Sequence, residues 1–148
     1  MCKYDFDMDM GPEQIMKSQN FEFLRSKWPE LAELGGFAEA YAHPDPAAGI
    51  TKLRGFCEQV VEWIHHDQRL PQPYRANLID LLSNQPFKDI TPDVILSKLH
   101  ALRMEGNHAV HRNNGDTTTA LRLIREAYNV ARWLYVSYGG GQVTDCPE

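Results

Sequence analysis

Apolar residues recur at steps of three and four along most of this chain, the spacing that gathers side chains on one face of an α-helix. The longest clear run lies within 46–66, where the apolar positions are Ile50, Leu53, Cys57, Val60 and Ile64. Together with start and stop residues, this spacing predicts helices over 21–28, 29–42, 46–66, 74–83, 91–103 and 118–138. No segment alternates as a strand does. The predicted fold class is therefore all-α, a bundle of five or six helices.

Short polar residues and prolines mark where several of these helices begin. Asp45 and Pro46 suit the cap and the first turn of one helix, and Asp116 or Thr117 suits the cap of the last. The segment from Asn84 to Ile90 has no helical period, so it is expected to be a loop.

The length of 148 residues fits one domain, and 43% hydrophobic with 24% charged residues is ordinary for a soluble globular protein. Residues 1–17 are acidic and rich in methionine, and they are expected to form a flexible tail or an arm that docks on a partner. The single helical domain is expected over 18–138. Residues 139–148 are interpreted as a glycine-rich linker or C-terminal tail.

A compact group of polar residues lies in 101–111, ALRMEGNHAVH, at the end of an apolar-periodic helix. If that helix continues through Gly106, then Arg103, Asn107 and His111 lie on one stripe. If Gly106 instead ends the helix in a left-handed turn, the residues after it lie in a loop. A polar helix terminus that satisfies nearby backbone groups is the simpler interpretation of the same residues.

Arg54 and Glu58 are four residues apart on the predicted 46–66 helix, so they can pair on its flank. A solvated surface pair is the ordinary outcome of such spacing. The alternative hypothesis places both in a buried polar cluster with Arg103, Asn107 and His111, which would tie two helices together.

The formal net charge of −5 argues against a surface that coats nucleic acid, although it is compatible with a local basic stripe. Such a stripe lies on the last predicted helix, where Arg122, Arg125 and Arg132 share a face. These arginines are candidates for contact with nucleic acid or with an acidic partner subunit. Solvated arginines that cover a helix flank produce the same pattern.

The cysteines Cys2, Cys57 and Cys146 are odd in number and far apart, which predicts neither a disulfide framework nor a structural zinc site. His108 and His111 have the spacing of metal ligands on a helix, but two ligands do not make a site, so no metal is expected. The chain has no glycine-rich phosphate loop, so no cofactor is expected in this domain. Without a signal peptide or a long apolar run, the expected location is the cytoplasm.

Three motifs and the last helix, which is rich in apolar and aromatic residues, carry a resemblance to a known family. The motifs are SQNFEFL at 18–24, AEAYAHPDPAAGITKLRGFCE at 38–58 and LRMEGNHAVH at 102–111. In this order and spacing, the chain resembles the helical N-terminal domain of the R (motor and nuclease) subunits of type I restriction-modification enzymes. The family pattern around the third motif is close to L-R-x-x-G-N-x-A-V-H. The resemblance covers roughly residues 18 to 138.

The resemblance implies a non-catalytic module of a DNA-restriction protein, which serves assembly or contacts DNA or partner subunits in defence against foreign DNA. In such R subunits the DNA-cleaving nuclease and the ATP-driven translocase follow this domain. ATP and Mg²⁺ are therefore expected only in downstream domains of a parent protein, which resembles an ATP-dependent endonuclease. The chain is then an excised domain or a small stand-alone relative, and a homo-oligomer is compatible with either.

The same family is considered a distant relative of the HEPN helical domains, many of which are ribonucleases with an R-x(4–6)-H motif. Arg103 and His108 have that spacing, which gives an alternative function as a HEPN-type ribonuclease or toxin that uses Arg103 with His108 or His111. The recurrent histidine of the family corresponds to His111, and this departure weighs against ribonuclease activity. A plain helical protein-interaction domain is the third alternative.

Overall fold

The structure is a computed structural model that describes residues 15–112 and 115–147. These residues form helices, and no strand occurs among them, which confirms the all-α prediction. The elements in chain order are η2 (Glu22–Leu24), α2 (Pro29–Tyr41), α3 (Pro46–Asp67), α4 (Leu78–Leu82), α5 (Gln85–Asp89), α6 (Asp93–Arg112), α7 (Thr117–Tyr138) and η3 (Val143–Asp145), of which η2 and η3 are short 3-10 helices.

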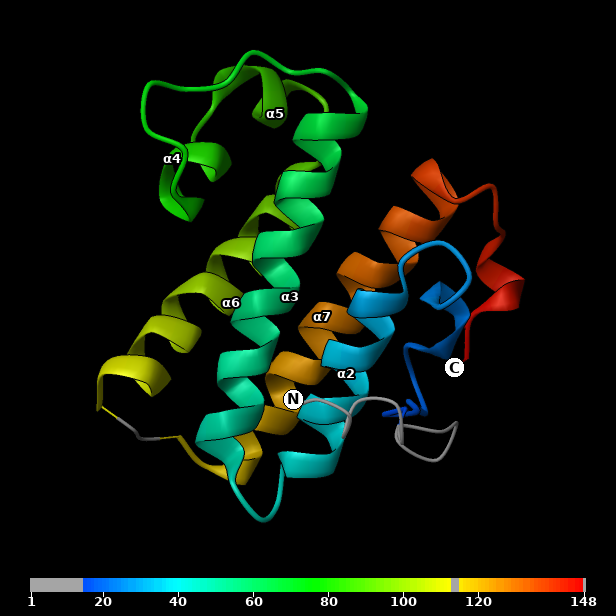
Figure 1. Cartoon of the computed structure of the whole chain (residues 1–148), viewed down its shortest axis with the longest axis vertical. Helices are drawn as coiled ribbons and strands as arrows, with labels where there is room; N and C mark the ends of the chain where they lie inside the picture. The colour runs from blue at the N-terminus through cyan, green and yellow to red at the C-terminus, as the bar shows by residue number, and fades with distance from the viewer. Residues whose placement is uncertain (1–14, 113–114, 148) are drawn as a thin grey trace, which may run out of the picture.

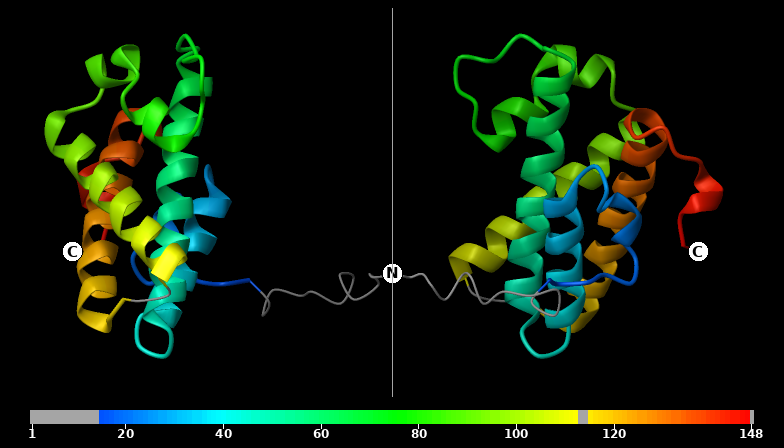
Figure 2. Two further views of the ribbon diagram at one scale, coloured as in Figure 1. Left: turned by 90° about the vertical axis from the view of Figure 1, so that its left-hand side faces the viewer. Right: turned by 45° about the vertical axis from the view of Figure 1, so that its right-hand side comes forward.

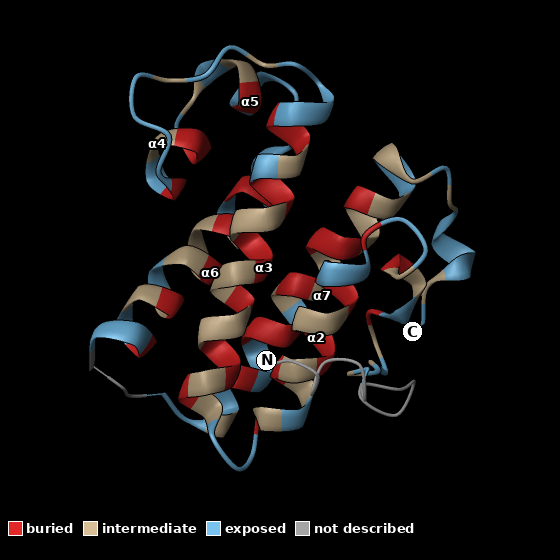
Figure 3. Cartoon of the chain, viewed as in Figure 1, coloured by how far each residue is buried: buried red, intermediate tan, exposed pale blue. Residues whose placement is uncertain are grey.

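The long helix α3 is the element against which the others pack. It contacts α2, α6 and α7, and α6 and α7 also contact each other (Figure 1). The short helices α4 and α5 lie together at one end of α3 and α6, away from η3 and the C-terminus (Figure 2). Buried residues follow the inner faces of the long helices and exposed residues the outer faces (Figure 3). The amphipathic pattern of the sequence therefore decides which faces meet.

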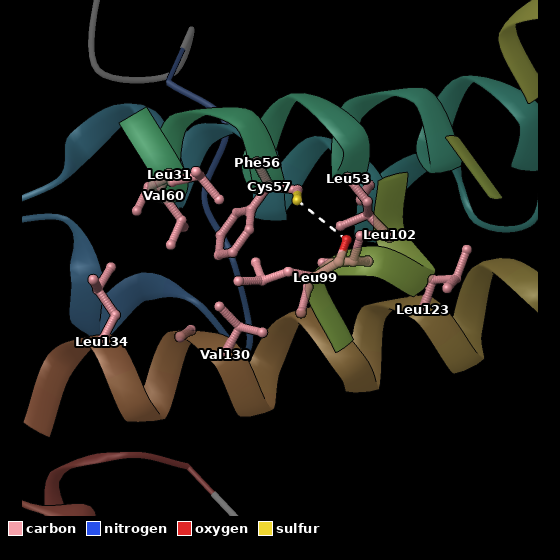
Figure 4. Packing of buried hydrophobic residues seen from close by; sticks show 14 of the residues in the cluster. Leu31, Leu53, Phe56, Cys57, Val60, Leu99, Leu102, Leu123, Val130 and Leu134 are labelled. Carbon is pink, nitrogen blue, oxygen red and sulfur yellow. Dashed lines mark hydrogen bonds between the residues drawn. The ribbon is translucent and has the colours of Figure 1, made fainter. Parts of the chain in front are cut away.

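The core lies between α2, α3, α6 and α7. The five apolar positions predicted on α3 are all buried, each with at most 1% of its surface exposed. Phe56 and Leu99 meet in this core, and the thiol of Cys57 donates to the Leu99 carbonyl oxygen at 3.3 Å (Figure 4). Since burying a Leu or Phe side chain contributes roughly 1.5–3 kcal/mol, this cluster dominates the stability of the fold.

Two predicted helix starts are confirmed by their caps. The Asp45 carboxylate accepts a hydrogen bond from the Ala48 backbone N–H at 3.3 Å, and Pro46 opens α3. The Asp116 carboxylate accepts from the Thr119 backbone N–H at 2.8 Å and begins α7. Each cap satisfies one of the N–H groups that have no partner inside the helix.

The helix predicted over 21–28 is wrong in its extent, because only Glu22–Leu24 form a single 3-10 turn. Trp28 has φ −131° and ψ 71°, outside the helical region. Proline disfavours helical geometry in the residue before it, and Pro29 then starts α2.

The loop predicted from Asn84 to Ile90 is also wrong, because this segment contains the helix α5. Phe87 on α5 is fully buried and stacks on His65 of α3 with ring centroids 5.0 Å apart. A five-residue helix has too few positions to show a period, so its burial against α3 leaves no repeat in the sequence.

Both predicted tails contact the bundle where the structure describes them. Arg25 donates from Nη2 to the Met16 carbonyl oxygen at 2.8 Å, and the Tyr128 hydroxyl donates to the Pro147 carbonyl oxygen. The described parts of these segments therefore contact the helical domain, while residues 1–14 lie outside the described residues.

Candidate functional site

The helix α6 passes through Gly106 without a break and crosses α3 at close range there. Gly106 is buried, and a β-carbon added to it would overlap the β-carbon of Arg54 on α3. A residue without a side chain is therefore required for this approach. Of the two arrangements open at Gly106, the structure has the continuous helix, so Arg103, Asn107 and His111 project from one stripe of α6.

Arg54 connects the two helices through hydrogen bonds. Its Nε donates to Asn107 Oδ1 at 2.7 Å, and its Nη1 donates to Glu58 Oε2 at 3.0 Å. All three residues are partly buried. The carboxylate holds the guanidinium in place for the bond to the amide oxygen, and charge-assisted bonds of this kind are among the stronger ones. We call Arg54, Glu58 and Asn107 the α3–α6 bridge.

Arg103 does not take part in the hydrogen bonds of the α3–α6 bridge. Its Nε is buried and has no hydrogen-bond partner among the described residues. Burial lowers the pKa of His100, and the nearby charge of Arg103 lowers it further. Burial raises the pKa of the Cys57 thiol, and Arg103 opposes part of that rise. Both groups are held in their neutral forms, so the Cys57 thiol is poorly suited to act as a nucleophile.

His108 and His111 are exposed, and within the described part of the chain neither hydrogen-bonds to the α3–α6 bridge. The expectation of a buried His111 is wrong. Ala109 is the last residue of α6 that the structure describes as buried. Val110 and His111, which follow it in the last turn of the helix, are exposed to solvent.

The side chains of Arg103 and His108 point to different sides of α6. Five positions along an α-helix separate two side chains by about 140° around the axis. His108 instead lines an open hollow of about 380 Å³ whose other polar walls are Glu105, Asp116 and Thr119. The ribonuclease spacing in the sequence is thus not matched by a paired arrangement in this structure.

The three candidate arginines of α7 lie in different environments. Arg122 reaches Glu105 on α6, with Nη2 and Oε2 3.4 Å apart, so it contributes to the contact between two helices. Arg125 is exposed. Arg132 is partly buried, and its guanidinium carbon lies 5.7 Å from the ring centroid of Tyr128. The single basic surface predicted from the spacing is therefore reduced to Arg125 and Arg132.

A carboxylate that the sequence did not reveal organises the segment before η2. Glu39 on α2 accepts hydrogen bonds from the Ser18 hydroxyl at 2.9 Å and the Asn20 side-chain amide at 2.7 Å. It also accepts from the backbone N–H groups of Gln19 and Asn20. Ser18 and Asn20 belong to the motif SQNFEFL, but a partner nineteen or more positions away on another helix has no local signal in the sequence.

Among residues 15–112 and 115–147, no three His, Cys, Asp or Glu side chains are placed to hold a metal ion together. None of the helices in this part of the chain combines the length and apolar character needed to cross a bilayer.

Comparison with known proteins relates this fold to a much larger enzyme subunit. The endonuclease subunit of the type I restriction enzyme EcoKI from Escherichia coli (strain K12) is 32% identical over 121 residues, which is 82% of this chain. The chain is similar to part of a type I restriction enzyme. The match covers 10% of the EcoKI subunit, so the chain spans a small part of its relative's length. No family model matches the chain, and no solved structure matches it.

The similarity to the EcoKI subunit includes the α3–α6 bridge. A match over 121 of 148 residues leaves 148 − 121 = 27 positions outside it, so an uninterrupted match contains residues 28–121 wherever it starts. This range holds α2 to α6 complete. The close crossing at Gly106 therefore lies in the part of the chain that resembles the restriction subunit.

Proposed function

We propose that this chain is a non-catalytic helical module of a restriction-system protein, where it contacts other domains or subunits of the complex. The observation that carries the proposal is the similarity to the EcoKI endonuclease subunit over 82% of this chain and 10% of that subunit. A match of this kind is expected when one domain recurs inside a longer protein. The continuous buried core of the helices supports a unit that folds around its own apolar cluster.

The chemistry of the α3–α6 bridge supports a structural role for the polar residues of α6. Arg54 uses two of its nitrogens on Asn107 and Glu58, inside the fold. Catalytic side chains must instead reach a substrate. In a restriction protein that contains this module, ATP and Mg²⁺ would be bound by other domains.

We further propose that the bundle is a HEPN-like scaffold. The support is the helical order together with the motif L-R-x-x-G-N-x-A-V-H, whose glycine and asparagine have physical roles here. Gly106 permits the close crossing with α3, and Asn107 accepts the hydrogen bond from Arg54. The motif thus encodes a helix junction rather than a paired arginine and histidine.

The proposal is tested by exchanging segments with the relative. The aligned segment of the EcoKI endonuclease subunit is replaced by the matching 121 residues of this chain, and restriction is measured as plating efficiency of unmodified bacteriophage. The hybrid is expected to restrict. Gly106→Leu in the hybrid should abolish restriction, because the added side chain forces α6 away from α3. The matched control is Gly55→Ala, because the new methyl group would lie 3.8 Å from the Leu34 side chain, an ordinary contact.

Immunoblotting of the hybrid separates function from loss of protein. A hybrid that is present at the level of the EcoKI subunit and does not restrict contradicts the proposed role. A second assay offers a generic RNA to the intact chain, and no cleavage is expected. RNA cleavage by the wild type that disappears in His108→Ala would replace the proposal with the ribonuclease alternative.

A further inference from the structure

A hollow on the outer side of α7 brings together polar residues that the α3–α6 bridge does not use. It has a volume of about 320 Å³, and its polar walls are Asn20, Arg125, Asn129 and Arg132. A second hollow of about 300 Å³ adjoins it along α7 and shares Asn129 and Arg132. We call the two hollows the α7 groove. Its shape is elongated along the helix, which suits a linear ligand.

The two arginines of the α7 groove have no carboxylate within ion-pair distance in the described part of the chain. The guanidinium of Arg132 lies over the ring of Tyr128 in a cation–π contact. The amide of Asn129, one helical turn from Arg125, has no hydrogen bond among the described residues and lines the space between the two arginines. The groove therefore holds two positive charges without counter-ions in a chain of net charge −5.

Two carboxylates, Glu39 and Asp145, lie close to residues that line the α7 groove, and both accept hydrogen bonds from other groups. Both carboxylate oxygens of Glu39 accept hydrogen bonds from the segment that includes Asn20. The carboxylate of Asp145 on η3 accepts from the Gln142 backbone N–H at 2.9 Å. Neither carboxylate is within ion-pair distance of Arg125 or Arg132, so the two arginines are available to an external anion.

We propose that the α7 groove binds the sugar–phosphate backbone of a nucleic acid, with Arg125 and Arg132 on separate phosphates. Seven positions of an α-helix correspond to about 10 Å along its axis, so the two arginine side chains start two turns apart and can contact separate phosphates of one backbone. Arginine and asparagine side chains are common donors to phosphate oxygens, and such contacts carry no base sequence. The inference goes beyond the proposed function and does not rest on it.

An acidic protein is the competing ligand, and the lining of the groove favours nucleic acid. Protein interfaces have apolar residues at their centre and polar residues at the rim. In the α7 groove the amide of Asn129 and the ring of Tyr128 lie between Arg125 and Arg132, and the apolar residues are toward the two ends, with Leu121 and Ile124 at one and Trp133, Val136 and Val143 at the other. A backbone of regularly spaced phosphates fits this distribution of donors.

The test measures binding of the intact chain to a fluorescent 20-base-pair DNA duplex and to one of its strands by polarisation, over a salt titration. Two phosphate contacts predict a slope of about −1.8 in log K against log salt for the duplex, or about twelvefold weaker binding at 200 mM than at 50 mM salt. Arg125→Gln/Arg132→Gln should weaken binding by about tenfold or more at 50 mM and flatten the salt slope toward zero.

The matched control is Arg122→Gln/Arg75→Gln, which also removes two positive charges, but from positions outside the groove. Arg122 is paired with Glu105, and Arg75 is exposed in the segment before α4. Far-UV circular dichroism and melting temperature verify that both double variants are folded. Retained binding by the control, with loss in the groove variant, supports the proposal.

Three results overturn the proposal: no binding of either nucleic acid by the wild type at low salt, equal losses in both double variants, or tighter binding of polyglutamate than of DNA at equal charge. The first removes the ligand, the second reduces the effect to net charge, and the third assigns the groove to an acidic protein. Stronger binding of the single strand than of the duplex, lost in the groove variant alone, supports the proposal and identifies the preferred form of the backbone.

Discussion

Replacing Gly106 by alanine tests the close crossing of α3 and α6 with the smallest possible change. The new methyl group would overlap the β-carbon of Arg54 and lie 2.9 Å from its γ-carbon. The β-carbon is fixed to the backbone, so the overlap cannot be relieved by a rotation of the Arg54 side chain. The two helices must therefore move apart, and the hydrogen bond of 2.7 Å between Arg54 and Asn107 is lost or lengthened.

The magnitude follows from opposing contributions to the free energy of unfolding. Alanine in place of glycine inside a helix stabilises by about 1 kcal/mol. Overpacking of a close contact costs about 1–3 kcal/mol, and a weakened hydrogen bond to a charged group costs about 1.5 kcal/mol or more. The net loss for Gly106→Ala is about 2 kcal/mol, which corresponds to a fall in melting temperature of about 6 °C for a domain of this size.

Gly55→Ala is the matched control, because a β-carbon at Gly55 would make only ordinary contacts, 3.8 Å from a methyl group of Leu34. Urea and thermal unfolding followed by circular dichroism should show a gain of up to about 1 kcal/mol for this variant. In an Arg54→Gly background the β-carbon that causes the overlap is absent, so Gly106→Ala should no longer destabilise. A Gly106→Ala protein as stable as the wild type, or more stable, would refute the reasoning.

Three further predictions concern single groups. Asn107→Ala should lower the free energy of unfolding by about 1–2 kcal/mol, because the partly buried Arg54 Nε loses its acceptor, whereas Asn107→Asp should retain most of the stability; urea titration checks both. The hydrogen bond from the Thr119 backbone N–H at the α7 cap lowers the pKa of Asp116. The contribution of Asp116 to the free energy of unfolding is therefore present at neutral pH and is lost as the pH falls below the ordinary Asp value of about 3.9. The difference in melting temperature between wild type and Asp116→Ala should shrink over that range, and a constant difference would contradict the prediction. Cys57 is buried with a raised pKa, so mass spectrometry after treatment with iodoacetamide should find it unmodified in the folded protein and modified in urea, while Cys146, which is partly exposed, reacts in both.

The long helices were predictable because each carries enough turns for its period and its caps to agree. α3 begins at Pro46, as Asp45 and Pro46 indicate, and its apolar face is the buried face. Short elements were not predictable in the same way. α5 is stabilised by the burial of Phe87 against His65, and that contact joins residues 22 positions apart. A local pattern cannot report a partner that the fold brings from elsewhere.

The polar residues of the candidate site show the same division between local and distant information. The stripe of Arg103, Asn107 and His111 follows from helix geometry once α6 continues through Gly106. Which of them meets α3 depends on where the helices cross. Because the helices cross at Gly106, Asn107 lies within hydrogen-bond distance of Arg54, whereas His111 lies in the exposed last turn of α6.

The arginines of α7 show that spacing along one helix is weak evidence for a binding surface. The residues that neighbouring helices place beside each arginine decide whether its charge is already paired. Arg122 and Arg125 are one turn apart, but Arg122 lies beside α6 and forms an exposed ion pair with Glu105 of that helix. The side chain of Lys98 on α6 similarly reaches Glu126 of α7 at 2.9 Å. Arg125 and Arg132 have no carboxylate within ion-pair distance among the residues that the structure describes. Where one helix carries positive charges and the neighbouring helices place no carboxylate beside them, an external anion binds most favourably.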